Sequence, residues 1–343
     1  MSTSKIHPRY VLPGIETQSA FAGVPLEAGA FCTIDWLRGT CHDSRRHELV
    51  DIIEDRFGPK SGCGPGAKYF KHGVDWPNGI KISYGHSSDI AMLDIRGERL
   101  SLLSYPERVD VLRMMIALGL KITRIDLAID YMFQNRMIYN NALASCKRME
   151  LARLRRYKPI EEFTSEGEPK QKTLALGSRD SPAYLRIYDK GLEQKIAAVG
   201  VWERIEAEFK GDRAPIVAQL VAEAAKPEKV IPDLIFGTVD FRIRNGRTEL
   251  ARRPQATWWA ELVGDHGMRV RSECQPVALQ RWREAFVNSY GRRILELAEA
   301  VGRPVGELVE FLLVGVRASQ GANHLADELR VYVQNSGGKQ SRS

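Results

Sequence analysis

The sequence lacks the cysteine pattern of a disulfide-stapled or zinc-binding protein. Its 5 cysteines are an odd number, they include no Cys-x-x-Cys pair, and no histidine-rich segment accompanies them. Disulfide frameworks and structural zinc sites need paired cysteines at short, regular spacings. The cysteines are Cys32, Cys41, Cys63, Cys146 and Cys274. We expect all of them to be reduced thiols.

Long apolar runs and a phosphate-binding loop are also missing. No stretch approaches the roughly 18 to 20 apolar residues that a membrane-spanning helix needs, and the first residues lead into Pro and Gly. The glycine-rich segment 62–66 is not followed by Lys-Ser or Lys-Thr, so nucleotide hydrolysis is not indicated. The sequence therefore predicts a soluble, cytoplasmic protein with no membrane partner.

The charge balance favours a polyanionic partner without requiring one. Lys and Arg total 50 against 43 for Asp and Glu, which gives a formal net charge of +7. Clustered cations release counterions when they neutralise phosphates, but many basic proteins bind no nucleic acid. Net charge alone therefore does not show whether the protein binds nucleic acid, and the positions of the charged residues have to be considered.

The order of strand and helix patterns indicates an α+β fold, because a strand-rich body precedes a helical C-terminal part. We expect strands at 31–37, 80–84, 92–95, 121–130, 173–177, 183–188, 202–210 and 236–244, and helices at 42–57, 106–118, 140–157, 189–199 and 214–226. The acidic segment 159–172 is expected to be a surface loop. The expected organisation is an irregular segment at 1–30, a main domain at 31–255 with two β-α-β-type halves (31–135 and 173–250), a helical region at 256–335 and a disordered tail at 336–343.

Four of the expected strands alternate apolar with charged side chains. Residues two apart in a strand point to the same side of the sheet. The charged sides are Arg124, Asp126 and Asp130; Arg186, Tyr188 and Lys190; Arg204, Glu206, Glu208 and Lys210; and Asp240, Arg242 and Arg244. A solvated outer face explains this pattern in a single strand, but acidic side chains are poor strand formers. Their repetition favours a functional charged face.

The carboxylates of this face are candidate ligands for Mg²⁺ or Mn²⁺, which prefer oxygen donors. Glu206 and Glu208 are two residues apart, or about 6.6 Å along a strand, whereas Asp126 and Asp130 are about 13 Å apart. We therefore predict Asp126, Glu206 and Glu208 as the metal ligands. For Asp130, an ion pair with an arginine is favoured over a place among the ligands.

Tyr188 is the candidate nucleophile. Most strand tyrosines pack their rings in the core, but the alternation places Tyr188 with Arg186 and Lys190, away from Leu185 and Ile187. A phenol with a pKa of about 10 is a weak nucleophile at neutral pH, so it needs a cation on the phosphate and a nearby ammonium group. We predict Tyr188, Lys190 and Arg186 as catalytic residues that form a phosphotyrosine link to DNA and release a 3′ hydroxyl.

In these segments the sequence resembles the Rep_trans-type family, the replication initiation factors of rolling-circle plasmids and filamentous phages. The matching pieces are Arg124 to Asp130, Gly177-Ser-Arg179, Leu185 to Gly191 with Glu193, Arg204 to Glu208, Phe241-Arg242 and Trp258-Trp259. The similarity runs from about residue 31 to residue 262.

The resemblance implies an initiator that nicks and rejoins single-stranded or cruciform origin DNA, with Tyr188 as its tyrosine and a divalent metal as cofactor. It implies mostly antiparallel sheets built from ferredoxin-like β-α-β units with helices on one face, and it makes residues 31–255 the nicking domain. Many other rolling-circle initiators carry a His-hydrophobe-His metal motif. The 7 histidines here include no such pair, which agrees with a carboxylate-based site.

Further basic residues are candidates for DNA binding: Arg124, Arg204, Arg242 and Arg244 on strands, and Lys147, Arg148, Arg153, Arg155 and Arg156 on the helix expected at 140–157. A solvated helix face explains the second group equally well. Trp258 and Trp259 stack unpaired bases or, as is more common at a helix start, belong to the core.

Two rival functions remain open: a DNA-binding regulator or origin-recognition protein without chemistry, and a metal-dependent nuclease in which water attacks. A homodimer and a host helicase are further partners on which the sequence does not decide.

Overall fold

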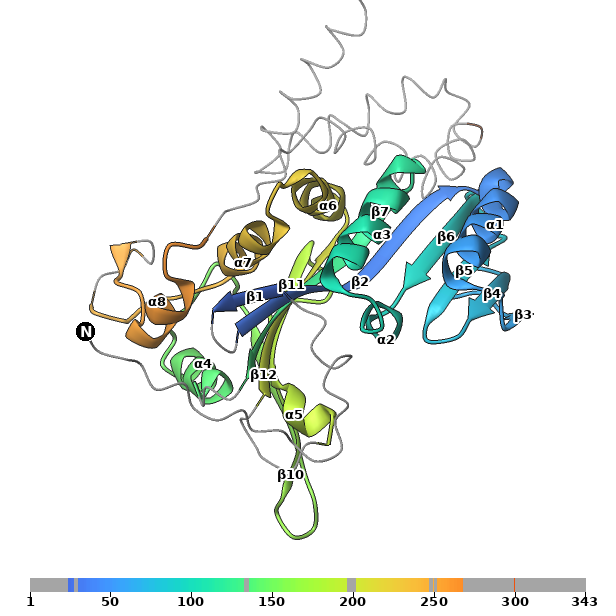
Figure 1. The fold of residues 1–343 in the computed structure, drawn as a ribbon. Coiled ribbons are helices and arrows are strands. Elements are labelled where there is room, and N and C mark those ends of the chain that lie inside the picture. The colour runs from blue at the N-terminus through green and yellow to red at the C-terminus, as the bar shows by residue number, and fades with distance from the viewer. Residues whose placement is uncertain are drawn as a thin grey trace, which may run out of the picture. The chain divides into compact units, whose positions relative to one another are not determined.

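The structure is a computed structural model that describes residues 24–27, 30–132, 136–195, 202–246, 249, 252–267 and 299. The chain divides into two compact units, residues 1–272 and 273–343. Of the second unit only Glu299 is described. The architecture below is therefore that of the first unit (Figure 1).

A large antiparallel sheet forms the centre of this unit. Its strands are β1 (Val24–Glu27), β2 (Ala30–His42), β3 (Gly62–Gly64), β4 (His72–Trp76), β5 (Ile80–Tyr84), β6 (Ile90–Ile95), β7 (Lys121–Met132), β9 (Tyr157–Phe163), β10 (Pro169–Leu176), β11 (Ala183–Asp189) and β12 (Trp202–Lys210). They follow the order β3-β4-β5-β6-β2-β7-β12-β11-β10-β9, and β1 pairs with β2. The two short strands β8 (Leu151–Ala152) and β13 (Asp240–Phe241) pair separately.

Some of the helices cover the apolar face of this sheet. The helices are α1 (Arg46–Phe57), α2 (Gly97–Leu100), α3 (Tyr105–Ala117), α4 (Ile138–Lys147), α5 (Lys190–Glu193), α6 (Arg213–Glu223), α7 (Pro227–Thr238) and α8 (Thr257–Val263). Helices α3, α6 and α7 contact β2 or β7, and Figure 1 shows them side by side along the sheet. Ile125, Leu127 and Ile129 of β7 are fully buried in the resulting core. The α+β class with mostly antiparallel strands is thereby confirmed.

The prediction of a basic helix at 140–157 is wrong for the second half of that segment. Helix α4 ends at Lys147, and Met149 and Arg153 then adopt left-handed φ angles of 60° and 69°. An α-helix of L-residues does not continue through such positions. The predicted row of basic side chains along one helix face therefore does not exist.

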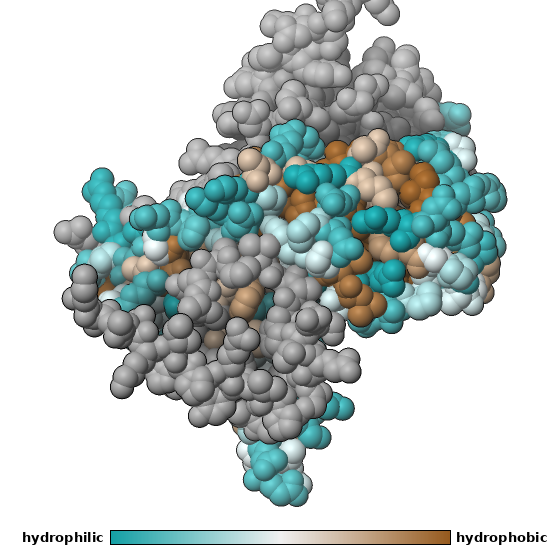
Figure 2. All heavy atoms as spheres, viewed as in Figure 1, coloured by the Kyte–Doolittle hydropathy of each residue, from teal (hydrophilic) through white to brown (hydrophobic). Residues whose placement is uncertain are grey.

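The surface loop expected at 159–172 is instead a hairpin of β9 and β10. All seven residues of β9 are exposed, which explains why their composition resembles that of a loop. The turn closes through a hydrogen bond from Thr164 N to Glu168 O of 2.8 Å, with Gly167 at a φ of 84°. Figure 2 shows hydrophilic residues over the tip of this hairpin.

The strand expected at 236–244 is reduced to β13, Asp240–Phe241. Residues up to Thr238 belong to α7, which begins with Pro227 in its first turn, where a missing N–H costs no helical hydrogen bond. Ile231, Leu234 and Ile235 then pack in the core. The helix predicted at 189–199 is likewise shorter, because α5 ends at Glu193, and residues 196–201 lie outside the described part.

Several expectations concern residues beyond the described ranges: most of the irregular segment 1–30, the helical region 256–335 apart from α8, and the tail 336–343. Four of the five cysteines are described, and all four are free thiols. Within the described ranges, none of the helices combines the length and apolarity that crossing a bilayer demands.

Candidate active site

Three neighbouring strands bring the predicted site residues onto one face of the sheet. Asp126 of β7 is opposite Glu208 of β12, and Asp130 is opposite Arg204. Arg204 is in turn opposite Tyr188 of β11. Directly opposed residues of antiparallel strands point to the same side. The shared charged face is therefore confirmed for β7, β11 and β12.

The fourth expected member of this face lies elsewhere. Strand β13 pairs with β8 in a separate two-stranded sheet, so Arg242 and Arg244 are not on the charged face. Arg242 Nε donates to Asp240 Oδ2 at 2.7 Å, and Arg244 Nη1 contacts Met149 Sδ at 3.8 Å. DNA binding by these two arginines stays a prediction.

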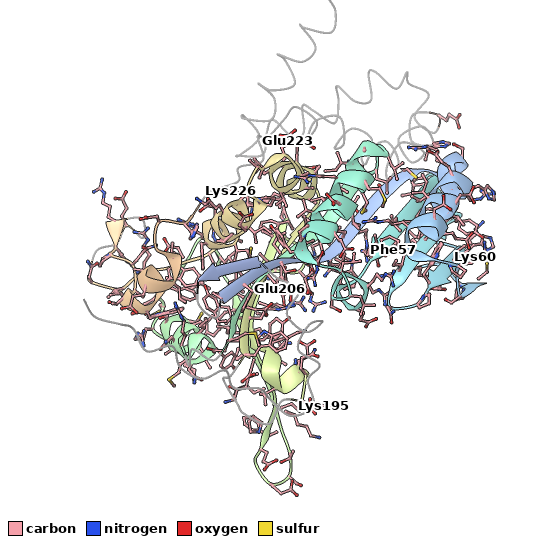
Figure 3. The ribbon with its side chains drawn as sticks, viewed as in Figure 1. Phe57, Lys60, Lys195, Glu206, Glu223 and Lys226 are labelled. Atoms are coloured by element: carbon pink, nitrogen blue, oxygen red, sulfur yellow. The ribbon has the colours of Figure 1, made fainter. Side chains whose placement is uncertain are left out.

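A cavity of about 1580 Å³ lies over the charged face. Its lining includes Asp35, Tyr184, Arg186, Tyr188, Lys190 and Glu206. Figure 3 shows Glu206 over the middle of the sheet and Lys195 beyond α5, towards the β9–β10 hairpin. The hairpin contributes Ile160 and Thr173 to the same cavity, so its wall extends well beyond the predicted catalytic group.

The hydroxyl of Tyr188 faces an acid inside this cavity. Tyr188 Oη donates a hydrogen bond of 2.8 Å to Glu206 Oε2, while Arg186 pairs with the other oxygen of Glu206. Lys190 Nζ lies 5.7 Å from the centre of the Tyr188 ring and binds Glu193 at 2.8 Å. The structure thus brings together all three predicted catalytic residues.

Burial dominates the acidity of this phenol. Tyr188 is 8% exposed, and desolvation raises its pKa well above the usual range. The positive charge of Arg204 opposes this rise in pKa, and the negative charges of Glu206 and Asp35 add to it. The hydroxyl is therefore protonated at neutral pH, so a reaction at its oxygen needs a proton acceptor.

Arg204 is the most firmly held cation of the face. Its Nε and Nη2 donate to Asp130 at 2.7 and 2.8 Å, and its Nη1 donates to Asp35 at 2.7 Å. Trp202 Nε1 also donates to Asp130 at 2.6 Å. The ion pair expected for Asp130 is confirmed. Three N–H groups of Arg204 are already bound. This favours a role for Arg204 as a fixed positive charge beside Tyr188, and not as a side chain that moves to bind a phosphate.

The three predicted metal ligands hold cationic side chains instead of one another. Asp126 binds Arg124 at 2.5 and 2.8 Å, and Glu208 lies 3.2 Å from Arg124 and 2.8 Å from Lys210. Burial raises the pKa of Asp126 to about 7, with Glu206 and Glu208 adding to the rise and Arg124 opposing it.

Oxygen donors of this kind suit Mg²⁺ or Mn²⁺, but their arrangement does not fit an ion. Among the described residues, no three His, Cys, Asp or Glu side chains are grouped so that they could hold a metal. In the described part of the chain, Glu206 lines the cavity, whereas Asp126 and Glu208 do not. The ligand set stays a prediction.

The basic residues predicted between the two halves make local contacts or are exposed. Arg148 binds Glu150 at 2.8 Å, and Arg153 donates to the carbonyl oxygens of Phe236 and Gly237 at 3.1 and 3.0 Å. All five are exposed, including Lys147, Arg155 and Arg156. Their role in DNA binding also stays a prediction.

The two tryptophans of α8 belong to the core. Trp259 is fully buried, and its ring centre lies 5.3 Å from that of Phe236. Trp258 packs on Phe241 at 5.0 Å, and its Nε1 donates to Ser145 Oγ at 3.1 Å. Packing therefore accounts for both rings.

Residues of this cavity that sequence reasoning missed include Tyr184, Asp35, Trp36 and Arg108. Tyr184 lies four residues before Tyr188 on β11, so the period of two already placed both rings on one side. Arg108 reaches the cavity from α3 and donates to Leu103 O at 3.0 Å, which no strand pattern could reveal.

The comparisons with known proteins agree with this arrangement. The family model described as replication initiation factor matches residues 120–307, more than half of the chain. The chain therefore belongs to the replication initiation factor family, as the sequence motifs predicted. No curated protein sequence matches it.

A solved structure gives independent support for the fold. The rolling circle replication initiator protein from Geobacillus stearothermophilus is 24% identical, with a TM-score of 0.58 over 71% of this chain and 100% of that one. At this identity the likeness concerns the fold.

Proposed function

We propose that this protein initiates rolling-circle replication by nicking and rejoining origin DNA through a covalent link to Tyr188. The observation that carries the proposal is the hydrogen bond from Tyr188 Oη to Glu206 Oε2, 2.8 Å long, in a cavity also lined by Arg186 and Lys190. Membership of the replication initiation factor family and the fold shared with a rolling-circle initiator support it.

The chemistry is an exchange of one phosphoester for another. Tyr188 Oη attacks the phosphorus of the scissile phosphodiester, and its proton passes to Glu206 Oε2, which already accepts its hydrogen bond. The bond from phosphorus to the 3′ oxygen breaks, and that oxygen takes up a proton to become a free 3′ hydroxyl. The 5′ phosphate remains on Tyr188, and the reverse sequence rejoins the strand.

The cations around the ring stabilise the charge that develops during attack. The guanidinium carbon of Arg186 lies 6.0 Å from the ring centre of Tyr188, and Lys190 Nζ lies 5.7 Å from it. Burial raises the pKa of the phenol, and Arg204, fixed by Asp130 and Asp35, opposes that rise. Charges already in place need no reorganisation when the phosphorane-like state forms.

Dependence on Mg²⁺ or Mn²⁺ remains part of the proposal from the sequence. The sequence predicts Asp126, Glu206 and Glu208 as the oxygen donors, which would require them to release their present cationic partners, and a bound cation would supply charge neutralisation at the phosphate. Because these carboxylates hold Arg124, Lys210 and Arg186, no step above is assigned to a metal.

The alternative is an origin-binding protein that performs no chemistry. The raised pKa of Tyr188 and the ion pairs of its neighbours favour it, since both features also describe a purely structural hydrogen-bond network. This alternative predicts DNA binding without a covalent product.

The deciding experiment is incubation of the full chain with a labelled pool of random single-stranded oligonucleotides and Mg²⁺ or Mn²⁺. We expect an SDS-resistant adduct, with the modified peptide mapping to Tyr188. Tyr188→Phe should form none, while Tyr184→Phe, on the same strand and the same face, should form it normally. An adduct that persists in Tyr188→Phe, or is absent from the wild-type chain, would overturn the assignment.

The metal is tested in the same assay. We expect EDTA to abolish adduct formation and added Mg²⁺ or Mn²⁺ to restore it. Full adduct formation in EDTA would exclude the predicted cation while leaving Tyr188 as the nucleophile.

A further inference from the structure

A tryptophan surrounded by three arginines lies on the same face as Tyr188. Trp36 of β2 is half-buried and lines the cavity that Tyr188 also lines. The guanidinium carbons of Arg124, Arg96 and Arg38 lie 3.9, 5.7 and 5.8 Å from the centre of its indole ring. Nothing in the proposed chemistry at Tyr188 uses this cluster.

A β-bulge explains why the ring is not in the core. The register between β2 and β7 shifts between Ile34 and Trp36, so that Asp35 and Trp36 both line the cavity. Leu37 then returns to the apolar face and is fully buried. A bulge of this kind re-aims a large side chain at the cost of a local break in the ladder.

The indole ring is held in place by its neighbours. Trp36 Nε1 donates to Asp94 Oδ1 at 2.6 Å, and Arg38 binds both oxygens of Asp94 at 2.9 and 3.0 Å. Arg124, stacked on the ring, is itself fixed by Asp126 at 2.5 and 2.8 Å. A side chain that is already fixed loses little freedom when a ligand binds.

Arg96 is the least tightly bound cation of the cluster. Its side chain is 46% exposed, and its Nε lies 3.8 Å from Asp94 Oδ2, a longer contact than that made by Arg38. Arg96 can therefore turn towards an added phosphate without breaking a short ion pair. A fixed ring beside an exposed guanidinium is suited to binding single-stranded nucleic acid, the ring by stacking and the cation by its charge.

The cluster lies at a distance that a few nucleotides can span. Through β7 and β12, Trp36 is in register with Tyr184 of β11, at about 14 Å for three strand spacings. Tyr188 lies four residues further along β11, or about 13 Å. Both ends open into one cavity.

We propose that Trp36, Arg96 and Arg38 form a subsite for one nucleotide of the single strand that carries the scissile phosphate. The base stacks on the indole face away from Arg124, and Arg96 binds the adjoining phosphate with Arg38 beside it. The proposal rests on the function proposed for Tyr188, and it adds a second contact to the same DNA strand.

The test uses Tyr188→Phe as the parent, so that binding is measured without chemistry. The probes are fluorescent oligothymidylate and an abasic oligonucleotide of the same length, which keeps the phosphates but has no bases. We expect the parent to bind oligothymidylate on the order of tenfold more tightly than the abasic probe. Trp36→Ala should lose this preference for bases, and Trp36→Phe should keep most of it.

The arginine contact has a different signature. Arg96→Ala should weaken binding of both probes and reduce the slope of log affinity against log salt by about 1. Arg113→Ala, which removes a cation from α3 that is 49% exposed, should change neither quantity. Equal loss of binding in Arg113→Ala and Arg96→Ala would show that net charge, not the cluster, accounts for the effect.

The outcomes separate this subsite from the proposed function. A Trp36→Ala variant that keeps its preference for bases overturns the subsite, as does a parent that binds no oligothymidylate, and neither result depends on where an adduct forms. A chain that shows the Trp36-dependent preference yet forms no adduct with the random pool overturns the nicking proposal alone. If Trp36→Ala melts at a lower temperature than the parent, Trp36→Leu supplies the same comparison with apolar bulk retained.

Discussion

The two faces of the central sheet are built from alternate residues of the same strands, yet they are stabilised in different ways. On β12, Ile205, Ala207 and Phe209 are almost completely buried under the helices. Between them, Arg204, Glu206 and Glu208 are also at least 93% buried, since their exposures are 6%, 2% and 7%. The first face gains free energy by removing apolar surface from water.

The second face buries charge instead, and it does so in pairs. Removing one partner of a buried pair leaves an uncompensated charge, whereas replacing both by apolar groups is often neutral or stabilising. Such a face is therefore a poor way to hold a fold together. Its ion pairs fit a surface whose charges are fixed in advance for a polyanionic substrate. The following substitutions test this division between the two faces.

The largest effect is expected on the charged face. Glu206→Gln keeps the shape of the side chain but removes the proton acceptor of Tyr188, and loss of a general base lowers rates by roughly a hundredfold to ten-thousandfold. We expect the initial rate of adduct formation to fall within that range. Glu48→Gln on α1, whose carboxylate is exposed and pairs with Arg45, is the control. A Glu206→Gln rate equal to that of the control would remove Glu206 from the mechanism.

A matched change on the apolar face should act on stability instead of rate. Ile205 is fully buried, and Ile→Ala in a packed core costs about 2 to 5 kcal/mol of unfolding free energy. Denaturant titration of Ile205→Ala should show this loss, and Ile205→Val should lose about 0.5 to 1.5 kcal/mol. Adduct formation by the folded fraction should stay within a few-fold of wild type. A hundredfold slower reaction in Ile205→Ala would contradict the assignment of stability to one face and reactivity to the other.

The smallest effect concerns Glu203, the one acid of β12 on the same side as the apolar residues. Glu203 is 4% exposed and accepts the N–H groups of Ile138 and Tyr139 at 3.0 and 2.9 Å, at the start of α4. Glu203→Gln should cost about 1 kcal/mol, as other losses at helix N-termini do. Thermal melts of the two proteins at neutral pH measure it.

The stability difference between the wild-type chain and Glu203→Gln should also depend on pH. Burial raises the pKa of Glu203, so its protonated form is favoured by folding. The wild-type chain should therefore gain stability relative to Glu203→Gln as the pH falls through this raised pKa towards the ordinary carboxyl range. A difference that shrinks on acidification would contradict this environment for Glu203.

The charged face could be predicted because the signal is local. A period of two in three strands places Asp126, Tyr188 and Glu206 on one side without knowledge of the topology, and antiparallel pairing of β7, β12 and β11 then makes them neighbours. The family motif selected Tyr188 over Tyr184, which the period alone does not distinguish.

The features that were missed depend on contacts between distant segments. The bulge at Trp36 breaks the alternation of β2, and Arg108 reaches the cavity from a helix. Helix α7 takes up residues 236–238 of the expected strand because tertiary packing of Ile231 and Leu234 outweighs a short alternating pattern. Ion pairing of the carboxylates also depends on which arginine lies opposite each of them on the neighbouring strand. A single sequence does not give the register between strands.

Strand β9 ends the sheet, and its composition bears on how the protein avoids self-association. Among the described strands β9 pairs only with β10, so its other side presents backbone N–H and C=O groups with which a strand of another chain could pair. Pro159 has no N–H to offer, and Lys158, Glu161 and Glu162 place charges along the same edge. The border of the sheet therefore discourages the addition of a strand from a second chain.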